Sequence, residues 1–211
     1  MSAKPRVAIL ISGRGSNMQA LIEAAREDQN YPAEIALVLS NKPEAPGLEI
    51  ARSLGVTALA VPSKPFGQER EAHERAIDAV LQEQKIAIVC LAGYMRILTP
   101  WLVNRWSGRM LNIHPSLLPV YKGLDTHARV LAAGETRHGC TVHLVTEGMD
   151  EGPILAQAEV PVFADDTEEI LAARVLAEEH LLYPAALAKL AREQGEGKAI
   201  FCEQKVAKKL C

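Results

Sequence analysis

The sequence has few aromatic residues, few cysteines and no long apolar run, and each shortage excludes a class of protein. Aromatic residues make up 4% of the 211 residues, too few for a base-stacking surface. The formal net charge of -3 gives no electrostatic basis for binding nucleic acid. The 4 cysteines lack CxxC and zinc-ligand spacings, which favours thiols of a reducing cytosol. The apolar run near the amino terminus is shorter than a membrane span and lacks a secretory cleavage site. We therefore expect a cytoplasmic protein with no nucleic-acid, membrane or metal partner.

Apolar runs and amphipathic segments alternate along the first half of the chain. The apolar runs at residues 6–12, 34–41, 56–62, 86–95 and 109–115 predict buried strands. The segments at 18–27, 45–55, 68–84 and 99–106 predict helices, the third of them with a strong apolar stripe. This alternation predicts an α/β fold with a mostly parallel, doubly wound, Rossmann-like sheet and helices on both faces.

The pattern changes after Pro119. Residues 126–135 predict a helix, and residues 138–162 predict two strands joined by a Gly-rich loop, so that the C-terminal part adds an antiparallel strand. Residues 167–193 predict a long helical stretch, interrupted or kinked at Pro184. For residues 195–211 we expect a short strand or a ragged tail. Because no repeat or linker is visible, a single domain over residues 1–211 is predicted.

The stretch MLNIHPSLLP, residues 110–119, places two hydrogen-bonding side chains at the end of a predicted strand. Asn112 and His114 are two residues apart, so they lie on the same face of an extended chain. Pro115 cannot donate to a sheet ladder and should end the strand there. Open α/β sheets bind ligands at that carboxyl edge. Taken alone, such a pair is more often a satisfied loop or core contact than a catalytic site, so other motifs must decide.

The motif SGRGSN, residues 12–17, connects the first predicted strand to a helix. Glycines allow a tight turn, and the free amides of a helix N-terminus form an anion site. The motif is neither a P-loop nor a complete GxGxxG fingerprint, so no dinucleotide is implied. It predicts a phosphate held by the backbone amides of Gly15, Ser16 and Asn17. The alternative is a plain tight turn in which Ser16 or Asn17 is an ordinary N-cap.

For several ionisable residues, the sequence does not decide between a structural and a functional role. Asp150, in the loop EGMDEGP, is a turn aspartate unless the loop folds back over His114, where a carboxylate favours the imidazolium. His143 lies in an alternating strand and faces either the core or the site. The remaining candidates are by default solvated charges, namely Arg70, Arg96, Glu178 and Glu179.

The motifs SGRGSN, LAGYMRIL, NIHPSLLP, HGCTVHLVTEGMDEGPI and EEHLLYP occur in this order. With this set, over roughly residues 5 to 190, the sequence resembles the phosphoribosylglycinamide formyltransferase family of purine biosynthesis. NIHPSLLP with the later D.G pair indicates folate-dependent formyltransferases, and SGRGSN narrows the resemblance to the glycinamide ribonucleotide branch. The resemblance implies transfer of the formyl group of 10-formyltetrahydrofolate, a co-substrate, to the glycyl amine of 5-phosphoribosylglycinamide, without a metal.

The resemblance also implies a role for each matching position. Asn112, His114 and Asp150 match the catalytic trio, in which His114 donates a proton and Asp150 raises its pKa. Gly15, Ser16 and Asn17 match the phosphate cradle. The folate site would consist of Arg70, Met95, Arg96, Ile97, Leu98, Thr146, Glu147, Gly148, Met149 and Asp150. The stretch closing over the ribonucleotide would be Leu176, Ala177, Glu178 and Glu179, with Glu179 on the ribose hydroxyls. Residues 1–111 would then form a phosphate-binding half, 112–195 a catalytic and folate-binding half, and 196–211 a tail.

The implied chemistry is direct attack by the free amine, since the sequence offers no nucleophile with a paired base. Attack creates an oxyanion, and preorganised donors for such an oxyanion contribute about 2.7–4 kcal/mol each in other acyl transfers. Asn112 and His114 would supply these donors, and His114 would protonate the leaving nitrogen. Asp150, directly or through a water, would take the amine proton.

Three alternatives remain at this point. A methionyl-tRNA formyltransferase would carry a tRNA-binding domain and more basic charge, and a formyltetrahydrofolate hydrolase an N-terminal regulatory domain. A non-catalytic nucleotide-binding module would keep the glycine loop without needing the trio. The sequence also leaves the oligomeric state open, with a homodimer as one alternative.

Overall fold

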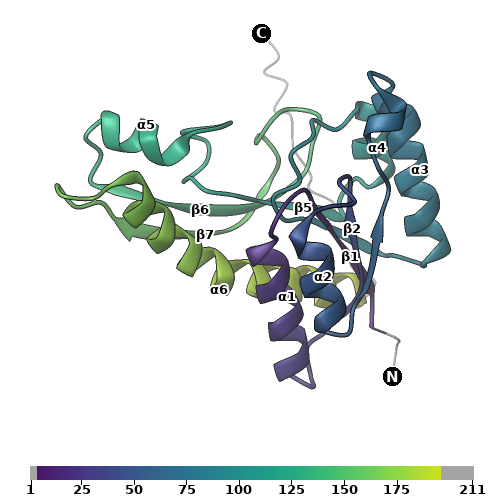
Figure 1. The fold of residues 1–211 in the computed structure, drawn as a ribbon. Coiled ribbons are helices and arrows are strands. Elements are labelled where there is room, and N and C mark those ends of the chain that lie inside the picture. The colour runs from purple at the N-terminus through teal and green to yellow at the C-terminus, as the bar shows by residue number, and fades with distance from the viewer. Residues whose placement is uncertain (1–3, 196–211) are drawn as a thin grey trace, which may run out of the picture.

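A seven-stranded sheet forms the centre of the computed structural model, which describes residues 4–195 (Figure 1). The expected tail at 196–211 lies outside the described residues. The strands are β1 (Arg6–Ile11), β2 (Glu34–Ser40), β3 (Thr57–Ala60), β4 (Ile88–Leu91), β5 (Met110–His114), β6 (Arg137–Leu144) and β7 (Ile154–Pro161). The helices are α1 (Ser16–Glu27), α2 (Pro46–Ser53), the 3-10 turn η1 (Lys64–Phe66), α3 (Arg70–Glu83), α4 (Pro100–Arg105), α5 (Thr126–Ala132) and α6 (Glu168–Gly195).

The strand order is β3-β2-β1-β4-β5-β6-β7. The pairs from β3 to β5 are parallel, whereas β6 runs antiparallel to both of its neighbours, β5 and β7. The α/β prediction of a mostly parallel, doubly wound sheet with an added antiparallel strand is therefore confirmed. Strands β2 and β3 are added on one side of β1, and β4 and β5 on the other, so the strand order reverses between β1 and β4. The carboxyl ends of the parallel strands β1, β4 and β5 meet at one edge there, where such sheets bind ligands.

Two apolar layers cover the two faces of the sheet. Alternate residues of β1 enter different layers, because side chains of a strand point to opposite faces. Val7, Ile9 and Ile11 pack with buried residues of α1, α2 and α6. Ala8 and Leu10 pack with buried residues of α3 and α4. Burial on both faces explains why β1 is apolar throughout rather than alternating.

The structure differs from the predicted pattern at the end of β4 and at Pro184. Strand β4 ends at Leu91, whereas the apolar pattern predicted a strand to residue 95, because Gly93 takes a φ of 70° and turns the chain. Helix α6 continues through Pro184, so the proline does not interrupt it. Tyr183 and Leu187 are fully buried on either side of Pro184, and this packing compensates for the missing amide donor. Within residues 4–195, no helix is long and apolar enough to cross a membrane.

Candidate active site

Strand β5 delivers Asn112 and His114 to the same side of the sheet edge, as their spacing predicted. His114 is 6% exposed, and its Nε2 lies 3.0 Å from the backbone carbonyl oxygen of Tyr121. Its Nδ1 lies 3.4 Å from Oδ2 of Asp150. Both ring nitrogens therefore face acceptors, the arrangement that suits a doubly protonated imidazole.

Asp150 reaches this position because the loop between β6 and β7 folds back over the end of β5. Its backbone has a φ of 53°, which side-chain-bearing residues rarely adopt. Its Oδ2 accepts a hydrogen bond from the amide of Gly123 at 2.9 Å. Burial acts to raise the pKa of the Asp150 carboxyl, but the contact with His143, the hydrogen bond from the Gly123 amide and the charge of His114 hold it below its ordinary value. Asp150 is therefore a carboxylate at neutral pH.

His143 faces the site, which the sequence left undecided. It pairs directly across the antiparallel ladder with Asn112. Its Nδ1 lies 3.0 Å from the carbonyl oxygen of Leu144 and, in the tautomer protonated at that nitrogen, donates a hydrogen bond to it. Its Nε2 can then accept from Nδ2 of Asn112 at 3.2 Å, and it lies 3.6 Å from Oδ1 of Asp150. Asn112 is thereby oriented with one amide hydrogen on His143 and one free. The orientation of His143 follows from the register of β5 against β6, which the sequence alone does not specify.

The glycine loop places free amides at the start of α1. Gly15, not Ser16 or Asn17, is the N-cap, with a φ of 72° and no side-chain cap. Ser16 and Asn17 are thus the first residues of the helix, where backbone amides lack intrahelical partners. Gly47 of α2 packs against the loop, and its backbone amide donates a hydrogen bond to the Gly13 carbonyl at 3.1 Å. This geometry fits an anion at the three predicted residues.

Glu179 of α6 lies beside this helix N-terminus. Its Oε2 accepts a hydrogen bond from Nδ2 of Asn17 at 2.6 Å, across 162 residues of sequence. The expectation that Glu179 is by default solvent-facing is wrong, since only 6% of it is exposed. Burial raises the pKa of its carboxyl, and the Asn17 hydrogen bond opposes that shift. Of the other predicted residues here, Leu176 and Glu178 are partly exposed and Ala177 is exposed.

Ser12 connects the glycine loop to the segment predicted to bind folate. Its hydroxyl donates to Oδ1 of Asn41 at 2.6 Å and accepts from the Met95 amide at 2.8 Å. Its own amide donates to the Gly93 carbonyl at 3.1 Å. No sequence pattern singles out Ser12 or Asn41, because these bonds join three strand ends that only the sheet order brings together.

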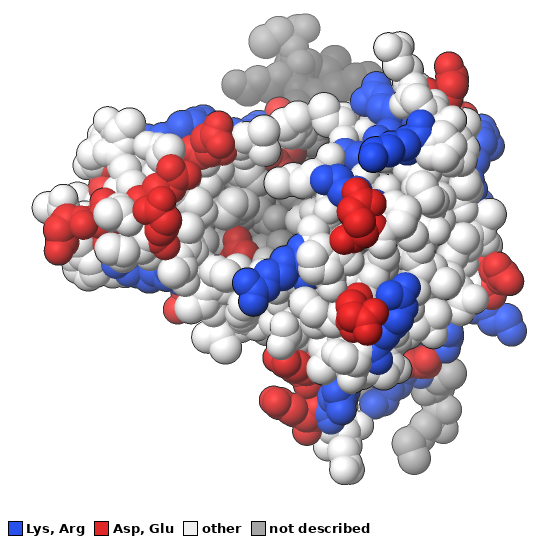
Figure 2. All heavy atoms as spheres, in the orientation of Figure 1, with Lys and Arg blue, Asp and Glu red and all other residues white. Residues whose placement is uncertain are grey.

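The remaining predicted folate residues surround the same edge from two loops. Met95 and Ile97 are 70% and 64% exposed, and Met149 of the opposite loop is 56% exposed, which leaves apolar surface for a flat ring. Asn104 of α4 donates to Glu147 at 2.8 Å and fixes the second loop. Arg70 is exposed at the start of α3, and within residues 4–195 its side chain makes no hydrogen bond or ion pair with either loop. The others, Arg96, Leu98, Thr146 and Gly148, lie on these loops with partial or full exposure. Figure 2 shows a hollow near the centre of this face.

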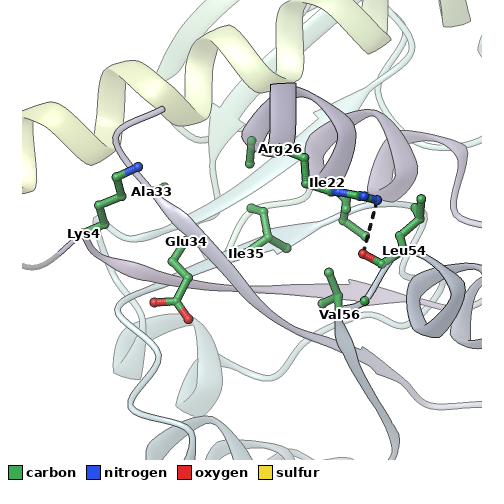
Figure 3. Close-up of a pocket in the computed structure, with 10 residues that line it drawn as sticks. Lys4, Ile22, Arg26, Ala33, Glu34, Ile35, Leu54 and Val56 are labelled. Carbon is green, nitrogen blue, oxygen red and sulfur yellow. Dashed lines mark hydrogen bonds between the residues drawn. The ribbon is translucent and has the colours of Figure 1, made fainter. Parts of the chain in front are cut away.

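A separate pocket of about 390 Å³ lies at the amino end of β2, away from this edge (Figure 3). It is lined by Glu34 and Ile35 of β2, the end of α1 and the turn after α2. None of the predicted site residues lines it. Within residues 4–195, no group of three or more His, Cys, Asp or Glu side chains could hold a metal ion.

Comparison with known proteins shows which family the chain resembles over most of its length. Residues 5–187 match the family described as formyl transferase. The phosphoribosylglycinamide formyltransferase of Escherichia coli (strain K12) is 44% identical over 181 residues, covering 86% of this chain and 84% of that protein. The crystal structure of phosphoribosylglycinamide formyltransferase from Brucella melitensis has a TM-score of 0.85 at 56% identity, covering 90% of this chain and 96% of that one. The trifunctional purine biosynthetic protein adenosine-3 of Bos taurus is 50% identical over 184 residues, but the chain spans only 18% of it.

The match over residues 5–187 and the fold shared with solved relatives show a formyl transferase, and the chain belongs to that family. The near full-length likeness to the bacterial proteins places it within the phosphoribosylglycinamide formyltransferase branch. The family resemblance seen in the sequence motifs is therefore confirmed.

Proposed function

We propose that the chain transfers the formyl group of 10-formyltetrahydrofolate to the glycyl amine of 5-phosphoribosylglycinamide, by direct attack through one oxyanionic tetrahedral intermediate. The observation that carries this proposal is the meeting of Asn112, His114 and Asp150 at one sheet edge, between a phosphate-type loop and an exposed apolar surface. The family membership supports the co-substrate.

Each polar group has a distinct role in the proposed reaction. The free amide hydrogen of Asn112 stabilises the oxyanion, because its other hydrogen is occupied by His143. His114 is anchored through Nε2 to a backbone carbonyl, so Nδ1 carries the proton for the leaving nitrogen. Oδ2 of Asp150 lies 3.4 Å from Nδ1 of His114, and this carboxylate collects the proton lost by the amine.

The two substrates would occupy neighbouring sites built from both halves of the chain. The amides of Gly15, Ser16 and Asn17 take the phosphate, and Glu179 takes the ribose hydroxyls. Glu179 belongs to the half formed by residues 112–195, but in this proposal it binds the substrate held by the phosphate-binding half, residues 1–111. Folate lies between residues 95–98 and 146–150, with Arg70 on its charged end, so both halves also share the folate site. All of these residues belong to one chain.

The test is an absorbance assay for loss of the formyl group from 10-formyldideazafolate, with and without 5-phosphoribosylglycinamide. Release that depends strictly on the ribonucleotide supports the proposal. Release to water alone would indicate a hydrolase instead, and bound folate without release would indicate a non-catalytic module.

The assembly and compartment are further parts of the proposal. Since all of the residues proposed for the two substrate sites belong to one chain, a homodimer would be compatible with activity but not required for it. Sedimentation velocity at several concentrations distinguishes a homodimer from a monomer. A cytoplasmic location is supported by the buried free thiols of Cys90 and Cys140, and cell fractionation tests it.

A further inference from the structure

Residues 121–125, the segment that leads into α5, hold both members of the His114–Asp150 pair through backbone groups. The carbonyl oxygen of Tyr121 accepts from Nε2 of His114 at 3.0 Å. Two residues later, the amide of Gly123 donates to Oδ2 of Asp150 at 2.9 Å. The imidazole and the carboxylate thus keep their separation only while this segment keeps its shape.

The segment adopts a backbone conformation that needs support from outside. Tyr121 and Asp125 have φ values of 54° and 55°, in the left-handed region that side chains disfavour. Gly123, between them, has a φ of 79°. Backbone conformations of this kind are energetically unfavourable, and they persist only where contacts with the surrounding structure stabilise them.

Arg129 of α5 supplies such contacts. Its Nη1 donates to the carbonyl oxygens of Lys122 at 2.6 Å and Leu124 at 3.2 Å. Its guanidinium carbon lies 5.3 Å from the centre of the Tyr121 ring. The Lys122 carbonyl belongs to the same peptide group as the Gly123 amide that holds Asp150, and this group directly follows the peptide group of the Tyr121 carbonyl that holds His114. One guanidinium group therefore fixes the peptide plane that carries the Asp150 contact, together with the peptide plane of the Leu124 carbonyl beyond it.

We propose that Arg129 is a positioning residue for formyl transfer, acting through residues 121–125 to keep His114 and Asp150 in register. This inference rests on the proposed function of that pair. Both hydrogen bonds of Arg129 run to backbone carbonyls, so its effect on the substrates is indirect. It acts on turnover rather than on the binding of either substrate.

A second contact ties the same segment to the Asp150 loop. Nζ of Lys122 lies 2.8 Å from Oε1 of Glu151, the residue next to Asp150. The pair is partly exposed, with side-chain exposures of 37% and 57%, so it is a weak tie. It nevertheless keeps the segment near its place when Arg129 is removed, and the loss of turnover is therefore partial.

The experiment compares R129M, which has similar length and no donors, with R129K, which keeps a donor at the end of a long stem. R26M is the matched control, since Nη1 of Arg26 also donates to a loop carbonyl, that of Leu54 at 3.4 Å, but beside the remote pocket (Figure 3). We expect R129M to lower kcat about tenfold with both KM values within about twofold, and R129K to recover most of kcat. R26M should match the wild-type enzyme.

Two results would overturn the inference: wild-type kcat in R129M, or a raised KM with kcat unchanged. Absence of ribonucleotide-dependent turnover in the wild-type enzyme would instead refute the proposed function. Nitrogen-15 NMR of the His114 ring separates the two cases without turnover, because R129M should shift the His114 resonances and R26M should not. Unshifted His114 resonances in folded R129M would also overturn the inference.

Discussion

Replacing Asp150 by asparagine keeps the shape of the side chain and removes its charge, so it isolates the electrostatic role of the carboxylate. The charges of Asp150 and a protonated His114 are 3.4 Å apart, with side chains 11% and 7% exposed. At an effective dielectric constant of about 20, such a pair interacts by about 5 kcal/mol. The new amide oxygen can still accept from His114, so we expect about 3–4 kcal/mol of this to be lost.

A loss of this size corresponds to a fall in kcat of about two to three orders of magnitude. The measurement is the turnover of D150N in the absorbance assay, with ribonucleotide affinity measured by calorimetry. Affinity should stay within about twofold, because the phosphate and ribose groups are held by α1 and α6 rather than by the Asp150 loop. A D150N enzyme with kcat within threefold of wild type would refute the pairing of Asp150 with His114. So would a loss confined to ribonucleotide affinity.

Three further substitutions test other parts of the molecule. E179Q should raise the melting temperature at pH 7, because burial raises the pKa of this carboxyl and its charge opposes folding there, while KM for the ribonucleotide rises about tenfold. G47A should cost about 1–3 kcal/mol in urea unfolding and weaken ribonucleotide binding, since a Cβ would lie 2.9 Å from the Gly13 carbonyl oxygen. Hydrogen bonds from Arg174 hold the pKa of Asp166 at about 2, below its ordinary 3.8. The stability difference between wild type and D166N should therefore be complete above about pH 4 and shrink as the pH falls toward 2; a pH-independent difference in melting temperature would contradict this.

The sheet could be predicted from the sequence because its strands are buried on both faces. Such strands are continuous apolar runs, and β1, β2 and β5 were located to within one or two residues. The end of β4 was missed, since the apolar run continues past Leu91 while the backbone turns at Gly93. Pro184 was predicted to interrupt or kink α6, but the helix continues through it because burial of the helix outweighed the local preference. Tertiary packing, which local patterns do not contain, therefore decided the case of Pro184.

The catalytic edge could be predicted only in part. The spacing of Asn112 and His114 was sufficient to place them together, because strand geometry alone fixes the direction of residues two apart. Asp150 required knowledge of where a loop folds, and the family resemblance rather than the residue pattern supplied it. His143 stayed undecided because an antiparallel register cannot be read from one strand. Glu179 was assigned to solvent by default, since a buried acid beside a helix N-terminus is an exception to ordinary burial preferences.

Residues 121–125 show why such sites remain partly hidden in a sequence. The groups that hold His114 and Asp150 there are a backbone carbonyl and a backbone amide, which every residue but proline possesses. Side-chain identity matters only for what keeps that backbone in place: a glycine at one left-handed position and an arginine on the next helix. The reaction chemistry does not require this glycine or this arginine to lie at a particular sequence distance from His114 or Asp150. Different side chains could brace the same backbone equally well, so the support is free to vary while the contacts to the imidazole and the carboxylate stay the same.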